Sequence, residues 1–132
     1  MTEVAASNLA NTPRLMLVED EPSLVSLLTR ILGRAGFEVD ACMTGTEALD
    51  RWEGAALAVV DLGLPDMPGE ELVAGLLQKS GNAPIIVSSG TPVSAELFGE
   101  AGGRVHVLPK PYLPQKLLEL IHQLLPTPPV GD

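Results

Sequence analysis

The sequence of 132 residues has little of several features that mark common classes of protein. It contains one cysteine, Cys42, so no disulfide can form within the chain, and this usage fits a reducing compartment such as the cytoplasm. Basic residues are scarce, with 8 Lys and Arg against 17 Asp and Glu, a net charge of −9. Because nucleic acids bind basic surfaces, this balance argues against direct nucleic-acid binding.

Long apolar runs are also missing, and aromatic side chains are scarce. No stretch approaches the roughly 18 uncharged apolar residues of a membrane-spanning helix, so we expect no membrane span in this chain. Aromatic residues make up only 3% of the chain, whereas hydrophobic residues reach 45%, which predicts one folded domain with an aliphatic core. We expect this domain at residues 14–125, between a flexible N-terminal segment (1–13) and a proline-rich tail or linker (126–132).

Short apolar runs alternate with amphipathic helical patterns along the predicted domain. The runs predict buried strands at residues 15–18, 37–43, 55–60, 84–87 and 105–108. Helical patterns cover residues 22–32, 44–52, 69–77 and 114–125, and a weaker one lies within the glycine-rich residues 92–103. Such alternation is typical of an α/β fold with a parallel sheet and helices on both of its faces.

Polar residues follow the ends of four of these predicted strands. They are Glu19 and Asp20 after the first strand, Asp61 after the third, Ser88 and Ser89 after the fourth, and Lys110 after the fifth. Each is ordinary alone, since Asp commonly starts turns and Ser commonly caps helices. Because parallel strands bring their carboxyl ends to one edge, we expect these side chains to meet at a single site.

This set of side chains suits the transfer of a phosphoryl group to a carboxylate. Crowded carboxylates attract a hard cation with oxygen ligands, typically Mg²⁺, which lets a dianionic phosphoryl group approach Asp61. A hydroxyl and an ammonium group can then neutralise the other phosphoryl oxygens.

The motifs resemble those of the receiver domains of two-component response regulators. The matching residues are Val18-Glu19-Asp20-Glu21-Pro22, the loop from Asp61 to Gly69 (DLGLPDMPG), Ser89, and Lys110-Pro111-Tyr112. The resemblance covers residues 14–125 and implies a flavodoxin-like (βα)5 fold, a three-layer sandwich with a five-stranded parallel sheet in the order 2-1-3-4-5.

The same resemblance implies a role for each site residue. Asp61 is the expected phosphoacceptor, Ser89 the switch hydroxyl and Lys110 the cation. Asp20 and Asp61 are expected to bind Mg²⁺ together with the backbone carbonyl of Gly63, and Glu19 mainly through ordered water. The implied phosphodonor is a histidine kinase or a histidine phosphotransfer protein, and phosphorylation would switch contacts with an output partner that the sequence does not identify.

Two positions depart from the usual pattern of the family. Val107 stands where the family usually has Phe or Tyr, and Gly90 stands where Ala is common. We expect phosphorylation to be retained. Because the Val107 side chain cannot act as an aromatic ring that swings inward, we expect the readout of phosphorylation to involve residues 90–104 instead. Asp66, between Pro65 and Pro68, is interpreted as a turn residue outside the metal site.

Two other functions remain open from the sequence. One is a receiver-like scaffold whose contacts do not depend on phosphate, which Val107 would allow. The other is a phosphohydrolase of the haloacid dehalogenase type, which also uses an Asp nucleophile but places a second Asp where this chain has Gly63. The sequence is also compatible with either a standalone receiver or a part of a hybrid kinase or longer regulator.

Overall fold

The computed structural model describes residues 12–93 and 103–125. The expectations of a flexible N-terminal segment and of a tail therefore lie outside the described residues, except for Thr12 and Pro13. The weak helical pattern within residues 92–103 lies almost entirely outside them as well. Within the described ranges, every helix is too short to cross a membrane.

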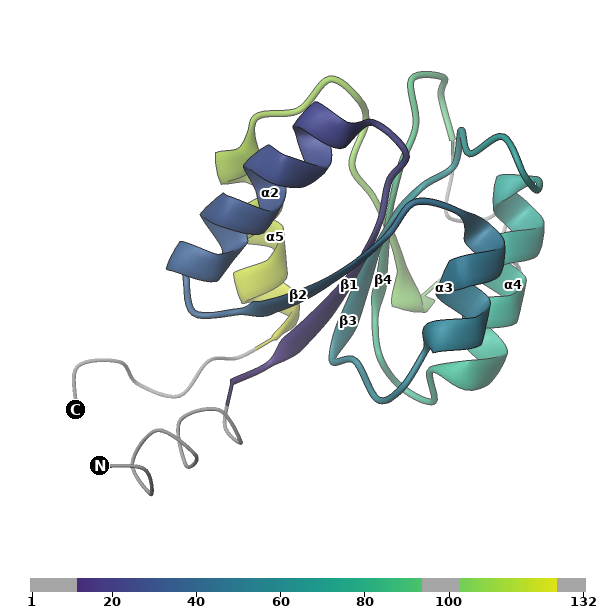
Figure 1. The fold of residues 1–132 in the computed structure, drawn as a ribbon, viewed down its shortest axis with the longest axis horizontal. Coiled ribbons are helices and arrows are strands. Elements are labelled where there is room, and N and C mark those ends of the chain that lie inside the picture. Colours follow the sequence, from purple (N-terminus) through teal and green to yellow (C-terminus); the bar gives the residue numbers. More distant parts are fainter. Residues whose placement is uncertain (1–11, 94–102, 126–132) are drawn as a thin grey trace.

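Five parallel strands form one sheet in the order β2-β1-β3-β4-β5, which confirms the predicted fold. The strands are β1 (Arg14–Val18), β2 (Glu38–Cys42), β3 (Leu57–Asp61), β4 (Ile85–Ser88) and β5 (Val105–Val107). The described helices are α2 (Pro22–Arg34), α3 (Gly45–Arg51), α4 (Gly69–Lys79) and α5 (Pro114–Leu124). Figure 1 shows α2 and α5 on one face of the sheet and α3 and α4 on the other.

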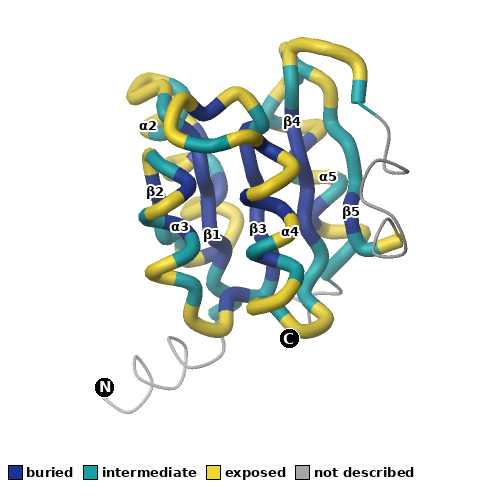
Figure 2. Tube along the Cα trace, turned by 90° about the vertical axis from the view of Figure 1, so that its right-hand side faces the viewer, coloured by how far each residue is buried: buried dark blue, intermediate teal, exposed yellow. Residues whose placement is uncertain are grey.

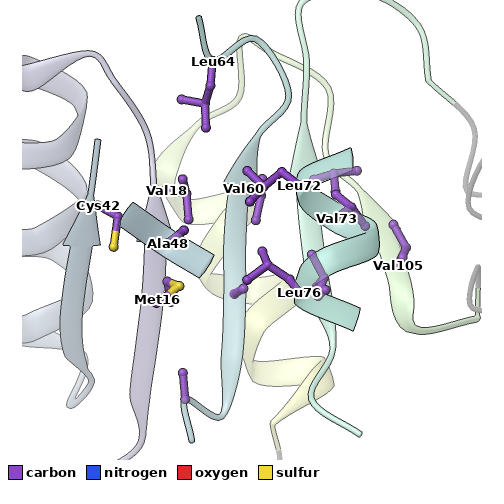
Figure 3. Close-up of a cluster of buried hydrophobic side chains, with 14 residues drawn as sticks. Met16, Val18, Cys42, Ala48, Val60, Leu64, Leu72, Val73, Leu76 and Val105 are labelled. Carbon is purple, nitrogen blue, oxygen red and sulfur yellow. The ribbon is translucent and has the colours of Figure 1, made fainter. Parts of the chain in front are cut away.

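The sheet separates two apolar clusters, one under each pair of helices. Alternate residues of β1 serve both, since Leu15 and Leu17 pack toward α2 and α5 while Met16 and Val18 pack toward α3 and α4. Figure 3 shows the second of these clusters, and Figure 2 shows buried central strands under helices with exposed outer sides. Burial on both faces explains why the central strands are continuous apolar runs in the sequence.

The first turn of α3 shows how local sequence sets a helix boundary. Thr44 is the N-cap residue, and its Oγ1 accepts a hydrogen bond from the Glu47 backbone N–H at 3.0 Å. The Glu47 side chain reaches back to the N–H of Met43 at 2.8 Å, one residue before the position of a standard capping box.

Candidate functional site

The carboxyl ends of β1 and β3 bring three carboxylates together. Carboxylate oxygens of Glu19, Asp20 and Asp61 lie within 4.8 Å of one another. Glu19 and Asp61 are only 2% and 7% exposed, and Asp20 is half-buried. The Glu19 backbone N–H donates to the Cys42 carbonyl at 3.0 Å, which extends the β1–β2 ladder to the first of the three acids. The arrangement is a compact set of hard oxygen donors, which fits Mg²⁺.

Lys110, in the segment that follows the edge strand β5, places a cation beside these carboxylates. Its Nζ lies 3.1 Å from Glu19 Oε1 and 3.4 Å from Asp61 Oδ2. Its backbone N–H donates to the Ser89 carbonyl at 2.9 Å, so the segment after β5 is held beside the end of β4. The Lys110–Pro111 peptide bond is cis.

Burial and the neighbouring charges shift the pKa values of this pair. Burial raises the pKa of Glu19, and the nearby Asp61 raises it further, against the opposite effect of Lys110. Burial alone would lower the pKa of Lys110, but the contacts with Glu19 and Asp61 raise it above its ordinary value. Lys110 is therefore a charged ammonium group at neutral pH, placed where negative charge gathers.

Asp61 is the last residue of β3 and is oriented by backbone groups of its own loop. Asp61 pairs with Ser88 in the sheet register, and the Leu62 N–H donates to the Ser88 carbonyl at 2.9 Å. The Gly63 N–H donates to Asp61 Oδ1 at 2.9 Å, which leaves Oδ2 facing Lys110. The proposed role of the Gly63 carbonyl in metal binding stays a prediction.

Ser89, the expected switch hydroxyl, is engaged by Thr91. Its Oγ lies 3.0 Å from Thr91 Oγ1 and accepts a hydrogen bond from the Thr91 N–H at 3.1 Å. A cavity of about 350 Å³ lies beside this turn and is lined by Ser89, Val107 and Lys110 among others. The backbone of Ser89 is thus fixed to Lys110, while its hydroxyl is held within a local turn.

Asp66 does more than form a turn. Its carboxylate accepts hydrogen bonds from the Gly45 N–H at 2.9 Å, from the Thr46 N–H at 3.0 Å and from Thr46 Oγ1 at 3.0 Å. It therefore caps the N-terminus of α3 from the loop between β3 and α4. The linear sequence offers no signal for this contact because helix and cap are about 20 residues apart.

Tyr112 follows Lys110 and Pro111 and packs partly against the apolar cluster under α2 and α5. Burial raises the pKa of its hydroxyl to about 12. Together with Glu21, Leu24 and Lys110, it lines a cavity of about 420 Å³ next to the carboxylates. This cavity lies between the start of α2 and the segment after β5, and Lys110 is the residue that it shares with the carboxylate cluster.

Comparison with known proteins places this geometry in context. The family model for the response regulator receiver domain matches residues 15–122. The transcriptional regulatory protein TctD of Salmonella typhimurium (strain LT2) is 33% identical over 115 residues, which cover 85% of this chain and 51% of TctD. CssR of Bacillus subtilis, also a transcriptional regulatory protein, is 30% identical over 83% of this chain and 49% of its own length. The chain thus spans about half the length of these relatives.

Solved structures of similar chains share the fold over nearly their whole length. The chemotaxis protein CheY4 of Vibrio cholerae matches with a TM-score of 0.76 and 27% identity, over 86% of this chain and 99% of CheY4. The response regulator TrrA of Thermotoga maritima, solved in complex with Mg²⁺ and BeF, matches with a TM-score of 0.73 and 26% identity, over 86% of this chain and 100% of TrrA.

Proposed function

The chain belongs to the response regulator receiver domain family, and from this premise we propose that Asp61 accepts a phosphoryl group from a phosphohistidine of a partner protein. The observation that carries the proposal is the contact of Lys110 Nζ with both Glu19 and Asp61, beside a cluster of three carboxylates. The partner is a histidine kinase or a histidine phosphotransfer protein. The resulting change in charge at Asp61 switches contacts with an output partner.

The transfer step follows from the arrangement around Asp61. A carboxylate oxygen of Asp61 attacks phosphorus, the bond from phosphorus to the imidazole nitrogen breaks, and that nitrogen takes up a proton. The product is an acyl phosphate, in which the Gly63 N–H still faces one oxygen of the former carboxylate. Lys110 neutralises charge on the phosphoryl oxygens and needs little movement, because its Nζ already lies 3.4 Å from Asp61 Oδ2.

Glu19, Asp20 and Asp61 would hold Mg²⁺, with the Gly63 carbonyl as a further ligand. The ion supplies positive charge that offsets the repulsion between these carboxylates and an incoming phosphoryl group. Glu19 is already paired with Lys110 at 3.1 Å, which supports an indirect contribution of this carboxylate, through ordered water, over direct binding of the ion.

Ser89 and Thr91 contact each other through hydroxyls of which either can be the donor, and the Ser89 hydroxyl has to direct its proton to the phosphoryl oxygen to donate to it. Its Oγ is 3.0 Å from Thr91 Oγ1, and the adjacent cavity of about 350 Å³ gives the turn room to rearrange. In members of the family that have Phe or Tyr at the position of Val107, the aromatic ring would compete for the space of this cavity. We therefore assign the readout of phosphorylation to the turn at Ser89–Thr91 and to residues 90–104, of which 94–102 lie outside the described residues. We place this function in the cytoplasm of a bacterial cell.

The deciding experiment is intact-mass spectrometry after incubation with Mg²⁺ and acetyl phosphate. We expect one phosphoryl adduct on the wild type and none on Asp61→Asn or without Mg²⁺. Asp50→Asn is the matched control, since Asp50 is an exposed carboxylate on α3 away from the site and should leave the adduct intact. Absence of an adduct on the wild type, with Mg²⁺ bound or not, would favour the phosphate-independent scaffold.

A further inference from the structure

The loop between β3 and α4, residues 62–68, is fastened at its middle to another element. Asp66 caps α3 through three hydrogen bonds to Gly45 and Thr46, all between 2.9 and 3.0 Å. Met67, the next residue, packs closely on Gly45: a Cβ at position 45 would lie 2.8 Å from the Cγ and Sδ atoms of Met67. Two consecutive loop residues thus contact the first turn of α3, one through hydrogen bonds and one through packing.

Both ends of the same loop are also closely fixed. At its start, the Gly63 N–H bonds to Asp61 Oδ1 at 2.9 Å. At its end, Gly69 lies so near Leu62 that a Cβ would come within 3.0 Å of the Leu62 backbone Cα. The path of residues 62–68 is therefore defined at its start, at Asp66 and at its end.

We propose that Asp66 is a positioning residue for the Mg²⁺ site, an inference that rests on the proposed function. Mg²⁺ demands nearly ideal octahedral geometry at short distances and tolerates little displacement of its ligands. A carboxylate can adjust by rotating, but the carbonyl of Gly63 moves only with the loop. Asp66 holds that loop, so its carboxylate acts on the metal site through the backbone without touching the metal.

The competing explanation is that Asp66 only stabilises α3. Thr44 offers a direct comparison, because its Oγ1 accepts a hydrogen bond from the Glu47 N–H of the same helix at 3.0 Å but, within the described residues, makes no side-chain hydrogen bond to residues 62–68. Thr44→Ala weakens the start of α3 and leaves the link to residues 62–68 in place. Asp66→Ala weakens the same helix end and removes the link.

The test is a calorimetric titration of the full chain with Mg²⁺ alone, combined with amide hydrogen exchange of residues 62–69. We expect Asp66→Ala to weaken Mg²⁺ binding by about tenfold, the lower end of the effect of residues that orient metal ligands. Exchange of the loop amides should become faster in the same variant. Thr44→Ala should retain the Mg²⁺ affinity of the wild type and the slow exchange of the loop.

Equal losses of Mg²⁺ affinity in the two variants, or no loss in Asp66→Ala, would overturn the positioning role. A wild type that binds no Mg²⁺ would instead overturn the proposed function and, with it, this inference. If Asp66→Ala does not fold, Asp66→Asn replaces it, since the amide keeps one acceptor for Gly45 and loses the acceptor for the Thr46 N–H. A smaller loss of affinity is then expected, and an unchanged affinity would overturn the proposal.

Discussion

Two loops flank Asp61 at the carboxyl edge of the sheet, and they are held in different ways. Residues 62–68 are tied outward to α3 by Asp66 and inward to Asp61 by the Gly63 N–H. Residues 89–93 contain a turn whose side-chain hydrogen bonds join Ser89 to Thr91, both within the same short segment. The first loop thus depends on distant partners, while the hydroxyl of the second is held by its own neighbour.

The two loops also differ in how closely their surroundings are packed. A cavity of about 350 Å³ adjoins the turn at Ser89–Thr91 and no residue of the first loop, while a cavity of about 300 Å³ lies between this turn and Leu62 and Gly69. Gly45 and Gly69 are packed against Met67 and Leu62 of the first loop. A group that receives charge works best when its surroundings are arranged beforehand, because no reorganisation is then needed during the reaction. A group that signals the charge has to move. Under the proposed function, the first loop would meet the first of these requirements and the second loop the other.

The largest expected effect comes from adding one methyl group at Gly69, where the first loop meets α4, with Gly90 of the second loop as the comparison. Gly69→Ala places a Cβ 2.8 Å from Leu62 Cβ and 3.0 Å from its Cα, so the backbone has to shift, and we expect a loss of about 1–3 kcal/mol in unfolding free energy. Among the described residues, and apart from its chain neighbours, no atom lies within 4 Å of the place that a Cβ would take at Gly90, so Gly90→Ala should stay within about 0.5 kcal/mol of the wild type. Urea unfolding measures both, and equal effects would contradict the contrast.

An intermediate effect is expected from Thr91→Val, which removes the hydroxyl contact to Ser89 and keeps the shape of the side chain. The backbone N–H of residue 91 still donates to Ser89 Oγ in this variant, so only the side-chain contact, worth about 1 kcal/mol, is lost, and phosphorylation by acetyl phosphate should become up to about fivefold faster. The same loss should lower the free energy of unfolding by at most about 1 kcal/mol, because Thr91 is exposed and water can replace the contact.

The control is the same substitution in a Ser89→Ala background, where no hydroxyl remains to be released. The gain in rate should vanish there, as a double-mutant cycle requires for two residues that act through each other. An undiminished gain would show that Thr91 acts on the site by another route and would remove the distinction between the two loops.

The sequence predicts the sheet and the meeting of the charged residues for a clear reason. Apolar runs such as 57–60 mark strands buried on both faces, and the residue after each run necessarily lies at the sheet edge. Asp61, Glu19 and Lys110 could therefore be placed together from their positions in the chain alone. The strand bounds differ by a residue or two, with Asp61 and Ser88 inside their strands.

The contacts of Asp66 and Thr91 could not be predicted in the same way. The Asp66 cap depends on how the loop folds over α3, and Asp between two prolines is equally suited to a plain turn. The engagement of Ser89 by Thr91 depends on side-chain rotation, which residue type does not determine. Periodicity therefore predicts where backbone elements lie, whereas hydrogen bonds between loops depend on tertiary packing.

The smallest expected effect is a dependence on pH that only the first loop should show. Hydrogen bonds from the backbone N–H groups of Gly45 and Thr46 hold the pKa of Asp66 below its ordinary value. The Asp66 carboxylate therefore binds a proton less readily in the folded state than in the unfolded state. Its contribution to the free energy of unfolding is complete above the ordinary Asp pKa of about 3.9 and declines as the pH falls through the lower pKa of the folded state.

Asp66→Asn tests this directly, because an amide does not titrate. The difference in unfolding free energy between wild type and Asp66→Asn should stay constant from neutral pH to about pH 5 and shrink below about pH 4. Other carboxylates titrate in both proteins and cancel in the difference. The matched difference for Thr91→Val should be independent of pH throughout, since no ionisable group is exchanged. A difference for Asp66→Asn that persists unchanged in acid would mean that the charge of Asp66 does not hold the first loop, and that shape alone distinguishes it from the second.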